Sequence, residues 1–513
     1  ELASSQLPQE ARTWVNQRLK YTHGYGLVMS PVNQVTTDGL PQLYIKDIPP
    51  ISNVNLSIKQ PAIYYGEETN NYIFTGAKTE EFDYPTGEGN ALTTYKGKGG
   101  VSIPSVWHRL AYAYDLGSLQ ILISNYFSNQ SRIHYYRQIP ERVKHVAPFL
   151  NLDNDPYLAV INGKLLWIVD AYTVSERYPY SQPIEQTKNA TDIFKGENNQ
   201  NILGSHINYI RNSVKVIVDA YNGTMQFFVV DESDPVLKTY RQIFPHLFEP
   251  KTAIPAELKA HFRYPQDLFK IQTQMYLTYH MSNPEVFYNR EDLWRFPIQT
   301  YEGNQQIMQP YYILMRLPRE EKEEFIIILP FTPANKDNMI AWMAARSNGK
   351  DYGKLLLYEF PKQKLVFGPR QIEARIDQTP EISQQFTLWN QSGSKVIRGD
   401  LLVIPIQESL LYVEPVYLRA EQGELPQLKR VIVAYDKAVV MEETLSKALA
   451  AIFGNVEVEK KAASSVTGAS SNLLKSALET YQQAQSALQQ GNWAEYGRHQ
   501  QELERILQKL NQR

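Results

Sequence analysis

The stretch HFRYPQDLFKIQTQMYLTYHMSNPEVFYNREDLWRFP, residues 261–297, gathers more large and polar side chains than any other part of the chain. Pro265 suits the first position of a helix, because its missing N–H would have no helical partner there. Asp267 places negative charge in the first turn, where the helix dipole favours it. One face then carries apolar side chains at helical spacing, namely Leu268, Ile271, Met275 and Tyr279. The stretch predicts a buried central helix that ends before Asn283-Pro284.

Polar and aromatic groups cluster at and beyond the two ends of this helix. They are His261, Arg263, Tyr279, His280, Tyr288 and Asp292. One interpretation is a ligand site, because irregular backbone at the ends of elements often carries function. The alternative is that these groups satisfy one another inside the core.

A second candidate lies in YTHGYG, residues 21–26, where two glycines bracket Tyr25. Glycine permits backbone angles that a side chain would forbid. The functional interpretation is a loop that brings His23 and Tyr25 close to a ligand. The alternative is an irregular crossover held by aromatic packing.

Composition excludes several classes of protein. Lys and Arg number 52 against 54 for Asp and Glu, so no global basic field would attract nucleic acid. The chain has no cysteine, and therefore no disulfide, thiolate nucleophile or Cys-ligated zinc. No apolar run approaches the roughly 18 residues of a transmembrane helix. A start at Glu1 without methionine suggests a part of a longer or processed polypeptide.

Metal binding is expected to be absent or weak. The nine histidines show no closely spaced ligand pair, so we predict no tightly bound transition metal and no cofactor. Asn151, Asp153 and Asp155 place oxygen atoms at alternate positions, as at the start of a calcium loop. Pro156 stands where that loop needs glycine, so a capped turn is the competing interpretation of this weak calcium candidate.

Strand patterns surround the central helix. Asn162-Gly163 and Asn222-Gly223 each separate two β-rich runs, which predicts two hairpins with type I′ turns. QPYYILMRLP and EEFIIILPF predict another hairpin, whereas NMIAWMAARSNG, residues 338–349, predicts a short helix ending at Gly349. The expected fold is α+β, with mixed, largely antiparallel sheets, packed helices and a C-terminal antiparallel two-helix hairpin.

The chain is expected to divide near its C-terminus. We predict that residues 1–440 form one α+β body, with subdomains at about 1–150, 151–250 and 251–440. Residues 441–471 are expected to form a short helix and a linker of small, polar residues. Residues 472–513 predict a helical hairpin, with Gly491 and Asn492 at its turn. Such a hairpin is a candidate for binding a protein partner or a second copy of the chain.

Several long motifs resemble uncharacterised protein family 0182 (UPF0182). They include YTHGYGLVMSPVN, KDIPP, EFDYP, RYPQDLFKIQTQMYLTYH, FYNREDLW, PFTP, NMIAWMAARSNGKDYGKL, LLVIPIQESLLYVEPVYL and ALQQGNWAEYG. The resemblance covers nearly the whole chain. It implies a large bacterial or cyanobacterial multi-pass membrane protein, of which this chain matches the soluble C-terminal portion. It also implies the N-terminal membrane region of the same protein as a partner, and it supplies no catalytic residues.

The sequence contains no complete catalytic signature. The favoured interpretation is a domain of a cell-membrane protein that faces the envelope, outside the cytoplasm, and serves interaction or ligand binding. The alternative is an enzyme acting on an envelope polymer such as a polysaccharide, with Asp or Glu as acid and base. A groove with exposed aromatic rings and two facing carboxylates would favour the enzyme.

Overall fold

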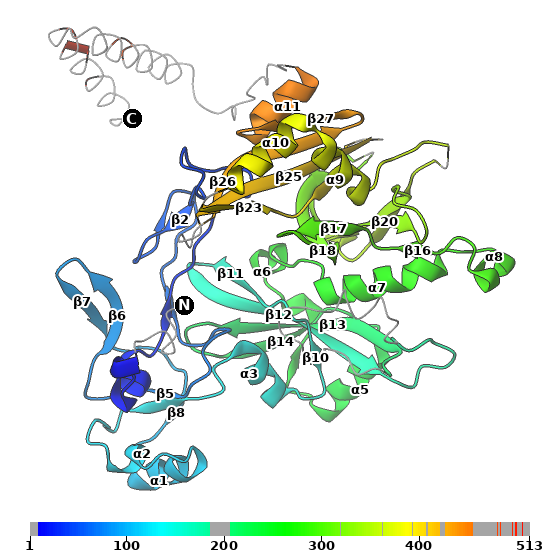
Figure 1. Ribbon diagram of the computed structural model, residues 1–513. Coiled ribbons are helices and arrows are strands. Elements are labelled where there is room, and N and C mark those ends of the chain that lie inside the picture. The colour runs from blue at the N-terminus through cyan, green and yellow to red at the C-terminus, as the bar shows by residue number, and fades with distance from the viewer. Residues whose placement is uncertain are drawn as a thin grey trace. The chain divides into compact units, whose positions relative to one another are not determined.

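The computed structural model describes residues 9–184 and 206–454, apart from 319, 362, 392, 407–408 and 421–425. It also describes six further positions, namely 480, 483, 495, 498, 499 and 505. Contacts divide the chain into two compact units, Glu1–Ile452 and Phe453–Arg513. The first unit mixes helices with largely antiparallel sheets, which confirms the α+β class (Figure 1). Apart from those six positions, the predicted C-terminal hairpin lies outside the described residues, and the predicted boundaries at 150, 250 and 440 stay predictions.

The N-terminal region consists of short elements and small sheets. Strands β1 and β4 pair, as do β2 with β3 and β6 with β7, while β5, β9 and β8 form a further sheet. Its elements are η2 (Gln9–Ala11), η3 (Asn16–Lys20), β1 (Gly24–Tyr25), β2 (Ile45–Lys46), β3 (Ile51–Ser52), β4 (Ala62–Ile63), β5 (Ile73–Thr75), β6 (Glu81–Thr86), β7 (Gly89–Thr93), β8 (Val101–Ser102), α1 (Val106–Asp115), α2 (Gln120–Ile123), β9 (Arg132–His134) and α3 (Ile139–Val146).

The first large sheet, called the first sheet below, follows the order β10-β12-β13-β14-β15, with β11 also paired to β12. All its pairs are antiparallel except β14 with β15. Its strands are β10 (Asn151–Leu152), β11 (Tyr157–Ile161), β12 (Lys164–Ser175), β13 (Tyr209–Asp219), β14 (Met225–Val229) and β15 (Phe248–Glu249), and helix α5 spans Pro235–Ile243.

Both Asn-Gly hairpins of this sheet are confirmed, but only one has the predicted turn. Asn162 and Gly163 have φ of 54° and 80° between the paired residues Ile161 and Lys164, as a type I′ turn requires. In the second hairpin only Gly223 has positive φ. There the Asp219 carboxylate accepts hydrogen bonds from the N–H groups of Tyr221 and Asn222, which holds a longer turn.

A helical connection joins the first sheet to the second. It comprises η4 (Lys251–Ala253), α6 (Ala256–Ala260), α7 (Gln266–Tyr279) and α8 (Pro284–Asn289). Helix α7 contacts β13 of the first sheet and β16 and β20 of the second (Figure 1). The predicted central helix is therefore confirmed, although Pro265 is its N-cap and α8 begins at Pro284.

The buried face of α7 differs from the predicted one. Leu268 and Ile271 are buried, but Met275 is half-buried and Tyr279 is exposed. Phe269, Thr273 and Leu277 are buried instead. The first turns of the helix lie between two sheets and are covered on several sides, whereas its last turn reaches solvent.

The second sheet follows the order β16-β20-β21-β22, with β19 also paired to β20, and β17 pairs with β18 beside it. Its elements are β16 (Trp294–Arg295), β17 (Ile298–Tyr301), β18 (Asn304–Ile307), β19 (Tyr311–Arg316), β20 (Glu323–Pro333), β21 (Ala341–Arg346), η5 (Gly349–Asp351) and β22 (Leu355–Glu359). The predicted hairpin around Pro318–Lys322 is confirmed as β19 and β20.

The helix predicted for residues 338–349 is wrong, because Ala341–Arg346 forms the central strand β21. All six of its residues are buried between β20 and β22. A strand covered on both faces has an unbroken apolar run, which periodicity cannot distinguish from a short buried helix.

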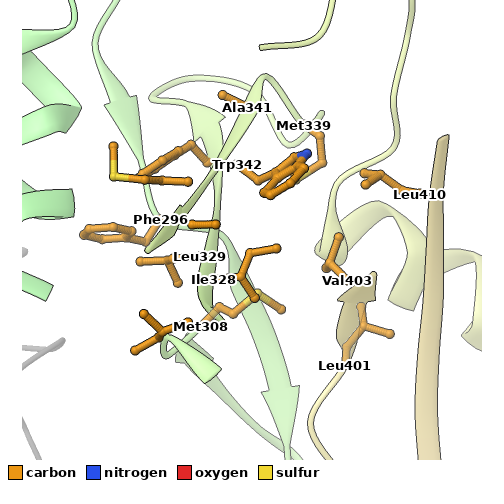
Figure 2. Packing of buried hydrophobic residues seen from close by; sticks show 14 of the residues in the cluster. Phe296, Met308, Ile328, Leu329, Met339, Ala341, Trp342, Leu401, Val403 and Leu410 are labelled. Carbon is orange, nitrogen blue, oxygen red and sulfur yellow. The ribbon is translucent and has the colours of Figure 1, made fainter. Parts of the chain in front are cut away.

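The third sheet follows the order β23-β25-β26-β27, with β24 also paired to β25. Its elements are α9 (Pro369–Gln378), α10 (Pro380–Trp389), β23 (Ser394–Arg398), β24 (Leu402–Ile406), β25 (Ser409–Ala420), β26 (Gln427–Tyr435), β27 (Ala438–Glu442) and α11 (Leu445–Phe453). A single buried cluster joins the second and third sheets, with Ile328 and Trp342 on one side and Val403 and Leu410 on the other (Figure 2).

Candidate functional site

The segment between α6 and α7 ties the first sheet to the second through Arg263. The Arg263 guanidinium lies 2.6 Å from the Asp155 carboxylate. It also lies over the rings of Tyr157 in β11 and Tyr312 in β19, at 4.0 and 4.8 Å from their centroids. One side chain therefore contacts both sheets through a salt bridge and two cation–π interactions.

Beside Arg263, a buried ion pair lies in the first sheet. Lys215 of β13 and Asp170 of β12 form a salt bridge, and both side chains are almost completely buried. Lys215 Nζ also donates to the carbonyl oxygen of Arg263 at 3.0 Å. Asn212 Nδ2 donates to Asp170 Oδ1 at 2.7 Å. These bonds fix the position of the connecting segment against the sheet.

Asp153 lies at the centre of the same network and is 4% exposed. Its carboxylate accepts hydrogen bonds from the Tyr172 hydroxyl and from the N–H groups of Asp155 and Asp267, the last two at 3.0 Å. Burial, followed by the charges of Asp267 and Asp170, raises the pKa of Asp153 to about 7. Burial also raises the pKa of Asp267, whose carboxylate accepts from the Asn154 N–H.

The network balances its charges when one carboxyl group is protonated. Its described ionisable side chains are four carboxylates and three cations, namely Asp153, Asp155, Asp170, Asp267, Lys215, Arg263 and Lys270. Burial raises the pKa of Asp153 to about 7 and also raises the pKa of the neighbouring Asp267, so these carboxyl groups share the balancing proton below about pH 7.

The weak calcium candidate falls inside this network. Asp155 is paired with Arg263, and Asp153 accepts three protein donors, while Asn151 pairs with Tyr172 between β10 and β12. Within residues 9–184, 206–454 and the other described positions, no group of three or more His, Asp or Glu side chains is arranged to hold a metal ion. The carboxylates that suggested calcium are used for hydrogen bonds and ion pairs.

A pocket of about 1220 Å³ lies against this network, between the two sheets. The first sheet contributes Asn212 of β13, and the connecting segment contributes Phe262 and Tyr264. The opposite wall is the turn between β21 and β22, with Ser347 and Tyr352. Junctions of this kind are where ligand sites commonly occur in proteins.

The described residues that line this pocket are of two main kinds, apolar side chains in the wall and basic side chains around them. Apolar side chains come from both sheets and from the connection: Ile210, Val230, Ile254, Phe262 and Leu268. The cations are Arg211, Lys251, Lys259 and Lys350, and the single carboxylate among these lining residues is Asp231. Arg211 is paired with Asp231 at 3.0 Å.

Asn212 supplies a polar atom that lacks a partner. Its Oδ1 is buried and accepts no hydrogen bond from the described part of the chain, although its Nδ2 binds Asp170. A buried amide oxygen without a donor costs about 1–3 kcal/mol. Asn212 lines the pocket, but its Oδ1 has almost no accessible surface, so the protein itself covers this oxygen.

The candidate residues predicted around the central helix separate into two groups. Arg263 lies in the network, and His261 is exposed at the end of α6, next to the pocket residue Phe262. The others lie around the far end of α7, whose 14 residues span roughly 20 Å.

At that far end, His280 stacks on Trp294 at 3.8 Å, and its ring nitrogens lie 2.9 and 2.8 Å from the carbonyl oxygens of Tyr276 and Asp292. The Tyr279 hydroxyl donates to Gln182, and Tyr288 is 87% exposed. None of these residues is part of the pocket lining described above.

His23 and Tyr25 lie in the N-terminal region. The His23 ring contacts the Thr22 hydroxyl at 2.9 Å and the Asp83 carboxylate at 3.2 Å, and it stacks on Tyr64. This order resembles a nucleophile, base and acid, but Thr22 is 1% exposed and donates to Glu81. Tyr25 packs beside Tyr84. The contacts of His23 are those of a satisfied core histidine.

Sequence reasoning missed the residues that form the pocket. Lys215 stands in the otherwise apolar run VKVIV, and a lone charge in such a strand is a usable signal for a buried pair. Lys251, Lys259 and Lys350 come from separate polar segments, and nothing in their local sequence indicates that they share one pocket.

These features define an α+β protein with a ligand-sized pocket between two sheets. The chain belongs to the Uncharacterised protein family (UPF0182), whose model matches residues 1–389. It is 66% identical to a UPF0182 protein of Trichodesmium erythraeum over 99% of this chain and 56% of that protein. It is 48% identical to a UPF0182 protein of Pelotomaculum thermopropionicum over 100% of this chain and 55% of that protein.

A third relative, a UPF0182 protein of Methanospirillum hungatei, is 50% identical over 97% of this chain and 54% of that protein. The chain thus spans just over half the length of these curated relatives. No solved structure matches the chain. The helices in the described part of the chain include none that is both long and apolar enough to cross a bilayer.

Proposed function

We propose that this chain is a ligand-binding domain and that the pocket between the first and second sheets is its binding site. The observation that carries the proposal is the pocket itself, whose walls come from both sheets and from the segment that joins them. Its volume of about 1220 Å³ exceeds the roughly 300–1,000 Å³ of typical ligand sites, so it suits a large ligand.

The buried network supports this proposal because it fixes one wall of the pocket. Tyr264 lines the pocket, its N–H donates to Ser347, and its carbonyl oxygen accepts from the Tyr312 hydroxyl at 2.6 Å. Arg263, its neighbour, is held by Asp155 and Lys215. A wall held this firmly needs little reorganisation when a ligand binds.

The enzyme alternative lacks a supporting observation at this pocket. Acid and base catalysis of glycoside hydrolysis needs two carboxyl groups that flank the substrate. The described lining contains Asp231, which is paired with Arg211. The Asp153 carboxylate accepts the N–H of Asp267, but both side chains are buried in the network and neither is part of that lining.

A neutral fluorescent probe, N-phenyl-1-naphthylamine, tests the proposed site. Ala260 is an exposed residue of α6 that lines the pocket, so Ala260→Trp should fill space there without disturbing the core. We expect the unmodified chain to bind the probe and the variant to lose binding at least tenfold. Ala111→Trp, on the exposed face of α1, is the matched control. Absence of binding to the unmodified chain, or equal binding by both Trp variants, would contradict the proposal.

The cellular setting belongs to the same proposal. The expected setting is a bacterial multi-pass membrane protein with this domain outside the cytoplasm, supported by the family resemblance and by the additional length of the relatives. Its expected partners are the membrane region of the same protein and, through residues 472–513, a protein partner or a second copy. In spheroplasts that make the full-length protein, added protease should cut within this chain. Protection until lysis would place the domain on the cytoplasmic side.

A further inference from the structure

The charges around the pocket are not balanced by the protein. Arg211 is neutralised by Asp231, the one carboxylate among the described lining residues. Lys251, Lys259 and Lys350 are exposed, and none of them forms a salt bridge with a carboxylate in the described part of the chain. Three ammonium groups from η4, α6 and η5 therefore surround the pocket. Lys350 lies near the Asp351 carboxylate, whose pKa its charge helps to lower, whereas Lys251 and Lys259 have no paired carboxylate in the described part of the chain.

This excess of positive charge is local, because the whole chain has a net charge of −2. Charges that gather around a low-dielectric wall raise the local concentration of oppositely charged ligands. Lysine ammonium groups act as mobile point charges, which suit an oxyanion whose orientation varies. Nη1 of Arg211 already donates to the Asp231 carboxylate and to the Ser233 hydroxyl.

The wall of the pocket provides the second part of the argument. Ile210, Val230, Ile254 and Leu268 present aliphatic side chains, and Phe262 and Tyr264 add aromatic ones. Burying apolar ligand surface against such a wall contributes about 25 cal/mol per Å². A small hydrated anion gains nothing from it, whereas a ligand with an apolar body does.

We propose that the ligand is an anionic amphiphile, with an oxyanion near Lys251, Lys259 and Lys350 and an apolar body in the pocket. This inference rests on the proposed function, since it names the ligand class of the same site.

Two related dyes test the charge preference. 1-Anilinonaphthalene-8-sulfonate carries a sulfonate on nearly the same ring system as the neutral N-phenyl-1-naphthylamine, and both have one aromatic N–H. We expect the anionic dye to bind at least tenfold more tightly at low ionic strength. The difference should shrink as salt rises, because screening weakens exposed charges. Equal binding of the two dyes would overturn the anion preference and leave the proposed binding site intact.

Charge reversal at two lysines tests whether this pocket causes the preference for the anionic dye. Lys251→Glu combined with Lys259→Glu should weaken binding of the anionic dye at least tenfold and leave the neutral dye within about twofold. Lys144→Glu combined with Lys238→Glu makes the same change in net charge on the exposed faces of α3 and α5. Equal loss in both double variants would overturn the assignment to this pocket. Loss of neutral-dye binding in the first variant alone would overturn a charge-specific role of the two lysines.

Competition experiments distinguish an anionic amphiphile from a free polyanion as the source of the bound oxyanion. Dodecyl phosphate below its critical micelle concentration should displace the bound sulfonate dye, and inorganic pyrophosphate at the same concentration should not. Displacement by pyrophosphate alone would overturn the amphiphile in favour of a free polyanion. Displacement by neutral dodecyl maltoside as effectively as by dodecyl phosphate would overturn the oxyanion. If neither dye binds, the proposed function fails together with this inference.

Discussion

Asp153 shows how a single residue can link the fold to pH. Its carboxyl group is surrounded by donors and yet is so deeply buried that desolvation dominates. An aspartate in the unfolded chain titrates near 3.9. The folded state therefore retains a proton that the unfolded state has lost between about pH 4 and pH 7. Stability from this group is present at low pH and falls as the pH rises through that window.

We expect Asp153→Asn to flatten this part of the pH profile. The wild-type free energy of unfolding should include a decline of a few kcal/mol between pH 4 and pH 7 that the variant lacks. Urea unfolding at several pH values measures the difference between the two slopes. Asp115→Asn, at an exposed position of α1, should keep the wild-type slope. Parallel profiles for wild type and Asp153→Asn would show that Asp153 is ionised throughout.

Lys215 carries a second prediction at the scale of one residue. Lys215→Met removes the partner of a carboxylate that is 3% exposed, so it should cost about 3–5 kcal/mol. Adding Asp170→Asn removes the uncompensated charge and should recover part of that loss. Thermal or denaturant unfolding of both single variants and the double variant gives the coupling energy. Simple additivity of the two losses would contradict the ion pair.

At the scale of elements, the sequence predicts what is local. The helix α7 and the Asn162-Gly163 turn follow from neighbouring residues, and both are confirmed, although the buried face of α7 is not the predicted one. The strand β21 and the turn at Asn222 depend on what covers or caps them, so local patterns do not decide them. The same limit applies to the pocket, whose cations lie between Arg211 and Lys350 in the sequence and converge only through the packing of two sheets.

Helix α7 allows a graded test of this packing. Leu268→Ala and Ile271→Ala should each cost about 2–5 kcal/mol, because both side chains are buried. Met275→Ala should cost less, since Met275 is half-buried, and Tyr279→Ala should be nearly neutral, since Tyr279 is 53% exposed. Denaturant midpoints of the four variants should follow this order. A large loss on Tyr279→Ala would mean that the end of α7 is covered in solution.

At the scale of the whole molecule, the described body is held together by clusters that cross element boundaries. The cluster in Figure 2 joins the second and third sheets, and Tyr172 of the first sheet belongs to it as well. Helix α11 packs on the third sheet through Ala448. The contact division between Ile452 and Phe453 therefore falls at the C-terminal end of α11, the last helix that contributes to these clusters.

A chain that ends after Gly454 should consequently keep the body folded. Such a truncation retains the sheets, α11 and the pocket, and removes most of the second compact unit. We expect one cooperative thermal transition within a few degrees of the full chain, and unchanged binding of the neutral dye. A chain that ends after Glu442 is the informative comparison, because it also removes α11 and uncovers Val433 and Leu411. It should melt at a distinctly lower temperature. If the chain that ends after Gly454 also loses its cooperative transition, residues 455–513 contribute to the stability of the body.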